Sequence, residues 1–114
     1  MDKIINKKIA EWLGFKVIAG SIFLFDDERG WYRDGALPDY ATSDVVAVTL
    51  LPVLVEKGHG ALLTDDGCKR WDFTIWVDMT INEDTETVNT IEVVGKATIA
   101  EAISAAVVKL IESI

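Results

Sequence analysis

The sequence predicts one α+β domain with the element order α-β-β-α-β-β-β-α, in which an antiparallel sheet packs with helices on one face or both. Three observations support this prediction. Segments with helical spacing of apolar residues stand at both ends and near the middle of the chain, and the segments between them have the composition or alternation of strands. The length of 114 residues fits a single domain, and half of the residues are hydrophobic, which is enough for a core without disulfides or metals.

The first helix is expected from about Asp2 to Leu13. Asp2 suits the N-cap position, and Gly14 stands where a left-handed C-cap residue belongs. Apolar residues recur on one face of this segment at helical spacing, namely Ile5, Ile9, Trp12 and Leu13.

Two strands are expected next. Residues 16–25 are rich in Val, Ile and Phe, which favours a strand. Residues 26–30 are acidic, end on Gly and predict a turn, after which residues 31–33 form a short return strand. Gly and Pro interrupt residues 34–40, so a loop is expected there.

The second helix should begin near Thr42 or Ser43, either of which can cap it, and should end before Gly58. Pro52 lies inside this segment. A proline within a helix removes one hydrogen bond and clashes with the preceding turn, at a cost of about 3 kcal/mol unless the helix bends. The sequence therefore predicts a kink or a restart at Pro52. The buried face is supplied by Val46, Ala47, Leu50, Leu51 and Leu54.

Three strands and a helix are expected in the second half of the chain. The strands are residues 61–64, 70–80 and 87–94, with a hairpin turn at residues 65–67 and a polar turn at residues 82–86. The central strand alternates, which indicates a half-buried antiparallel strand with Trp71, Phe73, Ile75, Val77 and Met79 on one face and Asp72, Thr74, Trp76, Asp78 and Thr80 on the other. The last helix begins at Thr98, which has capping-box spacing to Glu101.

Charge and composition restrict the partners and the compartment. Binding to nucleic acid depends on Lys and Arg that neutralise phosphates. Eleven scattered basic residues against nineteen acidic ones, a net charge of −8, argue against such a partner. The single cysteine and the absence of an apolar leader favour the cytoplasm. The apolar stretch at residues 45–55 is far shorter than the roughly 20 residues of a membrane span.

No motif for catalysis or metal binding is recognisable, so no catalytic residue, metal ligand or cofactor is expected. His59 is the only histidine, and Cys68 has no second cysteine at ligand spacing. The acidic residues at 26–28 and 65–66 stand in expected turns, where aspartate bonds its own backbone, and they do not follow the spacing of a calcium loop.

Residues 31–44 have the most unusual composition in the chain, because aromatic residues alternate there with Asp, Arg and Pro. Such residues are favoured in binding hot spots. In the alternative, Trp31, Leu37 and Tyr40 fold back and cover the sheet edge. Two interpretations are also open for Trp76: it packs under a helix, or it belongs to an exposed interface. The expected interaction surface comprises Trp31, Tyr32, Asp39, Tyr40 and Trp76.

Four segments carry a resemblance to a known family. Residues 9–15 (Ile-Ala-Glu-Trp-Leu-Gly-Phe) and 37–44 (Leu-Pro-Asp-Tyr-Ala-Thr-Ser-Asp) resemble segments of small phage and prophage proteins, although Ala41 precedes the threonine here. Residues 51–53 match a helical proline of these proteins, and residues 97–103 resemble their alanine-rich closing helix. Because these four segments follow one another in the family's order, the chain is similar to the phage ABA-sandwich domain family. The resemblance implies an α/β sandwich and a phage or prophage origin, but no activity and no catalytic residues.

The second half alone, with one helix, three strands and another helix, also has the element order of a double-stranded-RNA-binding domain. Such domains typically place several basic residues at the start of the last helix, where this chain has Lys96 and then Glu101. This topology can be present without the activity.

Taken from the sequence, the leading hypothesis is a non-enzymatic phage accessory protein of the host-cell cytoplasm that acts through protein–protein contacts, with a protein partner or as a homo-oligomer. The alternatives are a binder of double-stranded RNA and a small enzyme built from Asp, His59 or Tyr40.

Overall fold

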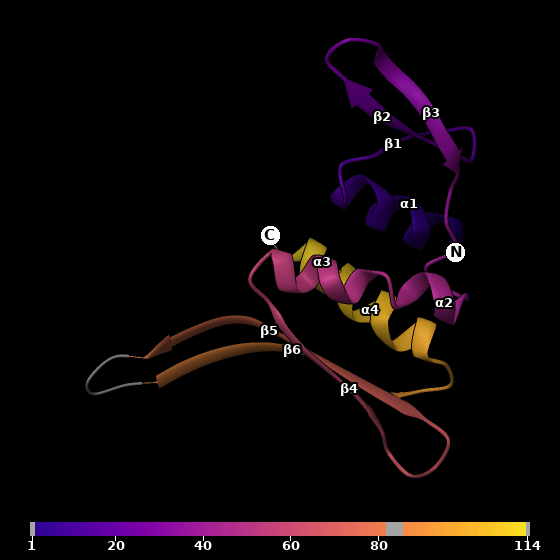
Figure 1. Cartoon of the computed structure of the whole chain (residues 1–114). Helices are drawn as coiled ribbons and strands as arrows, with labels where there is room; N and C mark the ends of the chain where they lie inside the picture. Colours follow the sequence, from indigo (N-terminus) through magenta and orange to yellow (C-terminus); the bar gives the residue numbers. More distant parts are fainter. Residues whose placement is uncertain (1, 82–85, 114) are drawn as a thin grey trace.

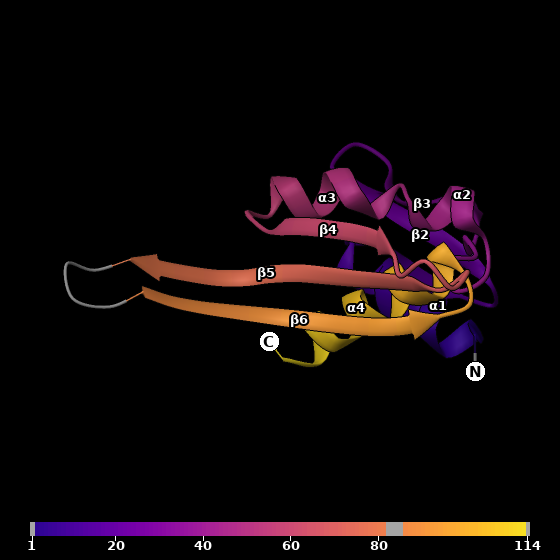
Figure 2. The ribbon, with the colours of Figure 1, turned by 90° about the horizontal axis from the view of Figure 1, so that it is seen from below.

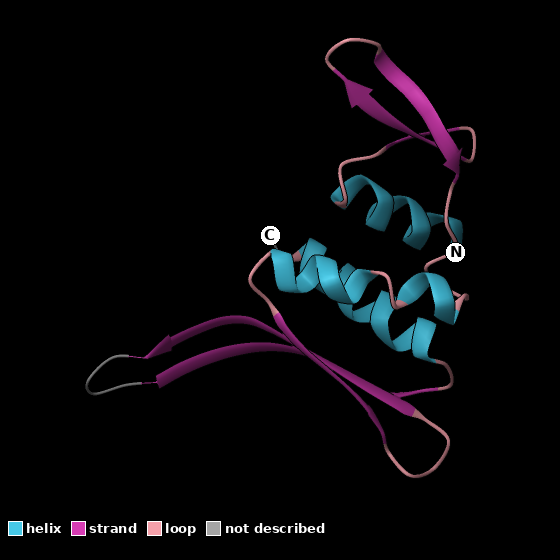
Figure 3. Cartoon of the chain, viewed as in Figure 1, coloured by secondary structure: helices cyan, strands magenta, loops and turns pink. Residues whose placement is uncertain are grey.

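The helices of the chain lie between two three-stranded antiparallel sheets (Figure 1). The computed structural model describes residues 2–81 and 86–113. Its elements are α1 (Asp2–Trp12), β1 (Lys16–Ile18), β2 (Ser21–Asp26), β3 (Gly30–Ala36), α2 (Asp44–Ala47), α3 (Leu50–Glu56), β4 (Gly60–Asp65), β5 (Trp71–Ile81), β6 (Glu86–Lys96) and α4 (Ile99–Glu112). The predicted α+β class and element order are confirmed. The described strands are divided between two sheets, one on each side of the helix layer (Figure 3).

The predicted strand over residues 16–25 is divided into β1 and β2 by a two-residue turn. Ile18 pairs with Ser21, and the intervening Ala19 and Gly20 have φ angles of 50° and 74°. Positive φ at both central residues is the requirement of a type I′ hairpin turn. Glycine adopts this conformation readily, whereas Ala19 is strained in it. This turn allows β1 to pair with β2 and completes the first sheet.

The next turn joins β2 to β3 where the acidic segment predicts it. Asp26 pairs with Gly30 across three loop residues, and the Asp26 carboxylate accepts a hydrogen bond from the Glu28 N–H at 2.8 Å. Gly30 has a φ of 74°, as expected where a three-residue hairpin loop returns to the strand. β3 extends to Ala36 and is therefore longer than the predicted strand.

The predicted second helix consists of two short helices, and the restart lies just before Pro52. The side chain of Ser43 caps α2 by accepting a hydrogen bond from the Val46 N–H. The chain then restarts with Thr49 as the N-cap of α3, so that Pro52 is the third residue of the new helix. The N–H groups of a first turn have no acceptor inside the helix, so the missing donor of Pro52 costs no hydrogen bond.

The core lies between the second sheet and the helices. α4 packs against β5, β6, α1 and α2, and its small residues bring it close to the sheet. The predicted alternation of β5 is confirmed for its described side chains, since Phe73 and Ile75 are fully buried and Trp71 and Val77 pack at the margin. The core is composed mainly of Ile9, Ala47, Leu50, Leu54, Phe73, Ile75, Val93, Ile103, Val107 and Leu110.

β5 and β6 extend past the body of the molecule (Figure 2). β4 pairs with β5 only from Trp71 to Trp76, and beyond this point β5 and β6 pair with each other alone. Residues 82–85 of the polar turn predicted at residues 82–86 lie outside the described residues. Over the part of the chain that the structure describes, no helix is long and apolar enough to cross a membrane.

Candidate interaction surfaces

The sheet of β1–β3 contacts the core through residues on one of its faces, close to β1, and the residues of its other face are largely exposed. Val17 and Ile22 belong to the first face, because Ile22 is buried in the core and Val17 packs against it. The pairing register places the alternate residues on the opposite face. We call that side the aromatic face; it consists of Lys16, Ile18, Ser21, Phe23, Phe25, Trp31 and Arg33.

Two exposed aromatic rings form the centre of the aromatic face. Phe25 and Trp31 pair across the hairpin, with ring centroids 5.5 Å apart and an interplanar angle of 64°. This edge-to-face arrangement is the one that aromatic quadrupoles favour. Even so, Phe25 is 58% exposed and Trp31 is 50% exposed. The pair is thus ordered by its own contact while much of its apolar surface remains in water.

Two cationic side chains share this face with the rings. The Lys16 ammonium lies 5.4 Å from the Trp31 ring centroid, within the range of a cation–π interaction. Arg33 Nε donates a hydrogen bond to Ser21 Oγ at 3.1 Å, which holds the guanidinium along the same face. Among the residues that the pairing register assigns to the aromatic face, these two cations are the charged ones; the exposed Asp34 lies beside Arg33 at the register shift of β3 and has no partner on β2.

The charge of the chain is divided unevenly along its length. Residues 1–36 contain six basic and six acidic residues, whereas residues 37–114 contain five basic and thirteen acidic ones. The net charge of −8 therefore resides in the part of the chain that follows the first sheet.

The second sheet also has an uncovered side. Phe73, Ile75 and Val93 face the helices, so the alternate residues of β4–β6 face away from them. We call that side the acidic face; its described residues are Leu62, Thr64, Asp72, Thr74, Trp76, Thr90, Glu92 and Val94. Among these it has two carboxylates and no Lys or Arg. Leu62 and Val94 are exposed large apolar residues.

Trp76 lies on the acidic face and not under a helix. Its ring rests over Gly60, its partner on β4: a Cβ atom at Gly60 would lie 3.3 Å from Trp76 Cε3. This contact with the neighbouring strand accounts for part of the burial of Trp76, which is half-buried.

The five residues of the expected surface are not brought together. Trp31 lies on the aromatic face. Tyr32 projects from the opposite side of β3, where the Arg29 guanidinium lies 5.8 Å from its ring centroid. Tyr40 is only 4% exposed and belongs to the core, so its prediction as a surface residue is corrected. Burial raises the pKa of its phenol.

Asp39 serves a contact inside the chain. Its carboxylate accepts hydrogen bonds from the Thr42 hydroxyl, the Thr42 N–H and Asn6 Nδ2, the last two at 3.2 Å. These donors, the Thr42 hydroxyl most strongly, lower the pKa of Asp39. The buried Asn6 also accepts a hydrogen bond from the Ala41 N–H at 2.9 Å. The group thereby fastens α1 to the segment before α2, and this explains the burial of Tyr40.

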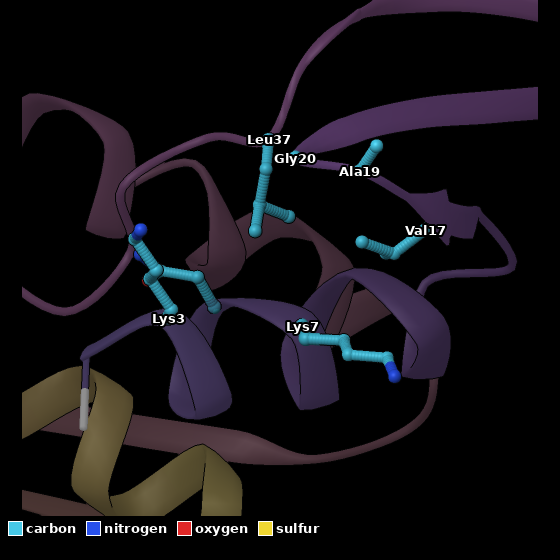
Figure 4. A pocket seen from close by; sticks show the side chains of 7 residues that line it. Lys3, Lys7, Val17, Ala19, Gly20 and Leu37 are labelled. Atoms are coloured by element: carbon cyan, nitrogen blue, oxygen red, sulfur yellow. The ribbon is translucent and has the colours of Figure 1, made fainter.

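One cavity lies between α1 and the turn from β1 to β2, with a volume of about 560 Å³ (Figure 4). Lys3 and Lys7 line it, but their side chains run in different directions and do not converge on one point. The Asn6 amide, also at its wall, is already bonded to Asp39 and Ala41. The lining residues offer no cluster that would hold an anion.

The single histidine and the single cysteine lie apart from each other and from this cavity. His59 Nδ1 is 3.3 Å from the carbonyl oxygen of Trp76. Cys68 is exposed in the turn between β4 and β5, where its N–H donates to Asp66 Oδ1 at 2.8 Å. In the ranges 2–81 and 86–113, no three His, Cys, Asp or Glu residues are grouped so that they could hold a metal ion.

The segment from α3 to α4 has the helix, three-strand, helix order expected from the sequence. Lys69, Arg70 and Lys96 come near the start of its last helix, and Arg70 Nη1 donates to the Gly95 carbonyl at 2.9 Å. The same end of the sheet carries the carboxylates of Asp65, Asp66 and Asp72. The local basic charge is thus balanced.

Sequence reasoning missed Phe25, Lys16 and Arg33 as members of an exposed surface. A usable signal was present: Phe25 and Trp31 stand at equal distances from the centre of the predicted turn, so a closed hairpin must place them opposite each other. No protein-family model, curated protein or solved structure matches the chain.

Proposed function

We propose that the chain is a non-enzymatic accessory protein of a phage or prophage, which acts in the host-cell cytoplasm by binding protein through its aromatic face. The exposed Phe25–Trp31 pair is the observation that carries this proposal. The resemblance of four segments to the phage ABA-sandwich family supports the origin.

The composition of the aromatic face supports protein binding. Trp, Phe and Arg are enriched in interfaces, and Trp and Arg are enriched among hot spots. A half-exposed aromatic side chain leaves on the order of 100 Å² in water. Burying that area against a partner contributes about 2.5 kcal/mol at about 25 cal/mol per Å². Phe25 and Trp31 are both half-exposed aromatic side chains. A partner that covers both rings would therefore lose considerable affinity if either ring were removed.

The proposal is tested by quantitative capture. The tagged chain is expressed in a bacterial host, and the proteins retained by the wild type are compared by mass spectrometry with those retained by Trp31→Ala and Phe25→Ala. Both variants should lose the same bound protein, whether this is a host protein or a protein of a prophage that the host carries.

Val45→Ala is the matched control, because Val45 is 78% exposed on α2 and belongs to neither sheet face. This variant should retain the bound protein. If Trp31→Ala and Phe25→Ala capture the same proteins as the wild type in the same amounts, and self-association of the chain is equally unaffected by the two substitutions, the proposed function is wrong.

A further inference from the structure

We propose that the partner of the aromatic face is the acidic face of a second copy of this chain, so that copies associate head to tail. This inference rests on the proposed function and specifies its partner. It follows from the positions of the two faces, from their charges and from the area that they offer.

The two sheets lie on opposite sides of the helices (Figure 1). The residues of each face alternate with residues that pack on the core, which are Val17 and Ile22 in the first sheet and Phe73, Ile75 and Val93 in the second, so the two faces point away from the core. A contact between the aromatic face of one copy and the acidic face of the next uses both faces and leaves one of each kind free at the ends. Such a heterologous contact continues into a chain of copies unless a rotation closes it into a ring.

The charges of the faces are complementary. Lys16 and Arg33 are the charged groups that the register assigns to the aromatic face, with Asp34 at the register shift beside Arg33, and Asp72 and Glu92 are those that it assigns to the acidic face. Two aromatic faces would bring cations together, and two acidic faces would bring carboxylates together. A symmetric dimer through either face is therefore penalised, whereas the unlike pairing is attractive.

The apolar groups also match in kind. Ile18, Phe25 and Trp31 stand exposed on one face, and Leu62 and Val94 stand exposed on the other, which also carries the half-buried Trp76. Two twisted sheets can pack face to face with interdigitated side chains at a spacing of about 10 Å.

The area limits the strength of the contact. The three exposed apolar side chains of the aromatic face offer on the order of 100 Å² each. Stable interfaces bury roughly 800 Å² on each partner. Association should therefore be weak and visible only as the protein concentration rises from micromolar toward millimolar.

The test is sedimentation velocity of the wild type and of two variants that each disable one face. Trp31→Asp places a carboxylate on the aromatic face, opposite the carboxylates of the acidic face. Val94→Lys places an ammonium on the acidic face, opposite Lys16 and Arg33; Val94 is 61% exposed, so its replacement leaves the core intact. The average mass of the wild type should increase with concentration beyond that of a dimer, whereas each variant alone should remain monomeric.

A mixture of the two variants gives the decisive result. Trp31→Asp keeps a working acidic face and Val94→Lys keeps a working aromatic face, so the mixture has one functional contact and should stop at a heterodimer. Val45→Lys is the control and should associate like the wild type. Circular dichroism checks the fold of each variant, and Phe25→Asp and Leu62→Lys replace any variant that fails to fold.

A wild type that remains monomeric at every concentration overturns the inference, as does a mixture without heterodimer or a Val94→Lys variant that associates like the wild type. If the wild type is monomeric but still captures a protein that Trp31→Ala loses, the head-to-tail inference fails and the proposed function stands. If neither association nor capture depends on Trp31, both fail.

Discussion

Replacing Asn6 with alanine removes the two hydrogen bonds that join α1 to the segment ahead of α2. The Ala41 N–H is buried and has the Asn6 carbonyl oxygen as its acceptor, so the Asn6→Ala variant leaves this donor without an acceptor. A buried N–H without a partner costs about 1–3 kcal/mol. The lost contact with the Asp39 carboxylate acts in the same direction. We therefore expect the free energy of unfolding to fall by about 2 kcal/mol or more.

Urea unfolding followed by tryptophan fluorescence measures this loss, since a shift of the midpoint at unchanged slope reports a change in stability. In thermal unfolding, the melting temperature should fall by about 4 °C for each kcal/mol in a chain of this size.

Two further variants separate the individual contributions. Asn6→Asp retains an acceptor for the Ala41 N–H but replaces the donor to Asp39 with a second carboxylate, so it should also destabilise at neutral pH and recover toward acid. Lys3→Ala alters an exposed position on the same helix and should change stability by less than about 0.5 kcal/mol. If Asn6→Ala costs no more than Lys3→Ala, the reasoning on the buried donor is refuted.

Three more predictions concern acid stability and two backbone positions. Because the pKa of Asp39 is lowered on folding, its contribution to stability is fully present above the unfolded pKa of 3.8 and is lost as the pH falls through the folded pKa. In urea unfolding, the stability advantage of the wild type over Asp39→Asn should therefore shrink below pH 3.8. A difference that stays constant with pH would contradict this. Ala19→Asn should stabilise the chain by about 1 kcal/mol, because Asn-Gly suits a type I′ turn and Ala19 is strained there; a loss of stability would show that the turn is of another kind. Pro52→Ala should change the unfolding free energy by less than about 1 kcal/mol, since a gain near the roughly 3 kcal/mol cost of an interior proline would mean that α3 is strained by it.

The local signals in the sequence located the helices, although Asp2, which was expected at the N-cap, is the first residue of α1. Thr98 caps α4 and accepts a hydrogen bond from the Glu101 N–H at 3.1 Å, as the capping-box spacing predicted. The division into two sheets was not predicted, because residues 16–25 form an apolar run in which only the small residues Ala19 and Gly20 mark a turn. Alanine is uncommon at positive φ, so this turn carried little signal.

The candidate site was predictable in part. Trp31, one of the five residues of the expected surface, is exposed, whereas Tyr40, nine residues later in a loop, was assigned to the same surface and is buried. Its burial depends on Asn6, which bonds the loop from a helix 33 and 35 residues away in sequence. Periodicity along a single segment contains no information on such a contact. The exposure of Phe25 likewise depends on which face of the sheet receives the helices.

The unequal share of the core held by the two sheets has a consequence for dynamics. Within residues 16–36, all described, Ile22 is the one buried residue, whereas the second sheet contributes Phe73, Ile75 and Val93. The free energy of local opening is lower in regions with few buried contacts than the free energy of unfolding the whole molecule. The amide hydrogens of β2 and β3 should therefore exchange with solvent by local opening, well before those of β5 and α4. A partner bound to the aromatic face would slow this opening, so that hydrogen exchange in β2 and β3 becomes a direct reporter of occupancy.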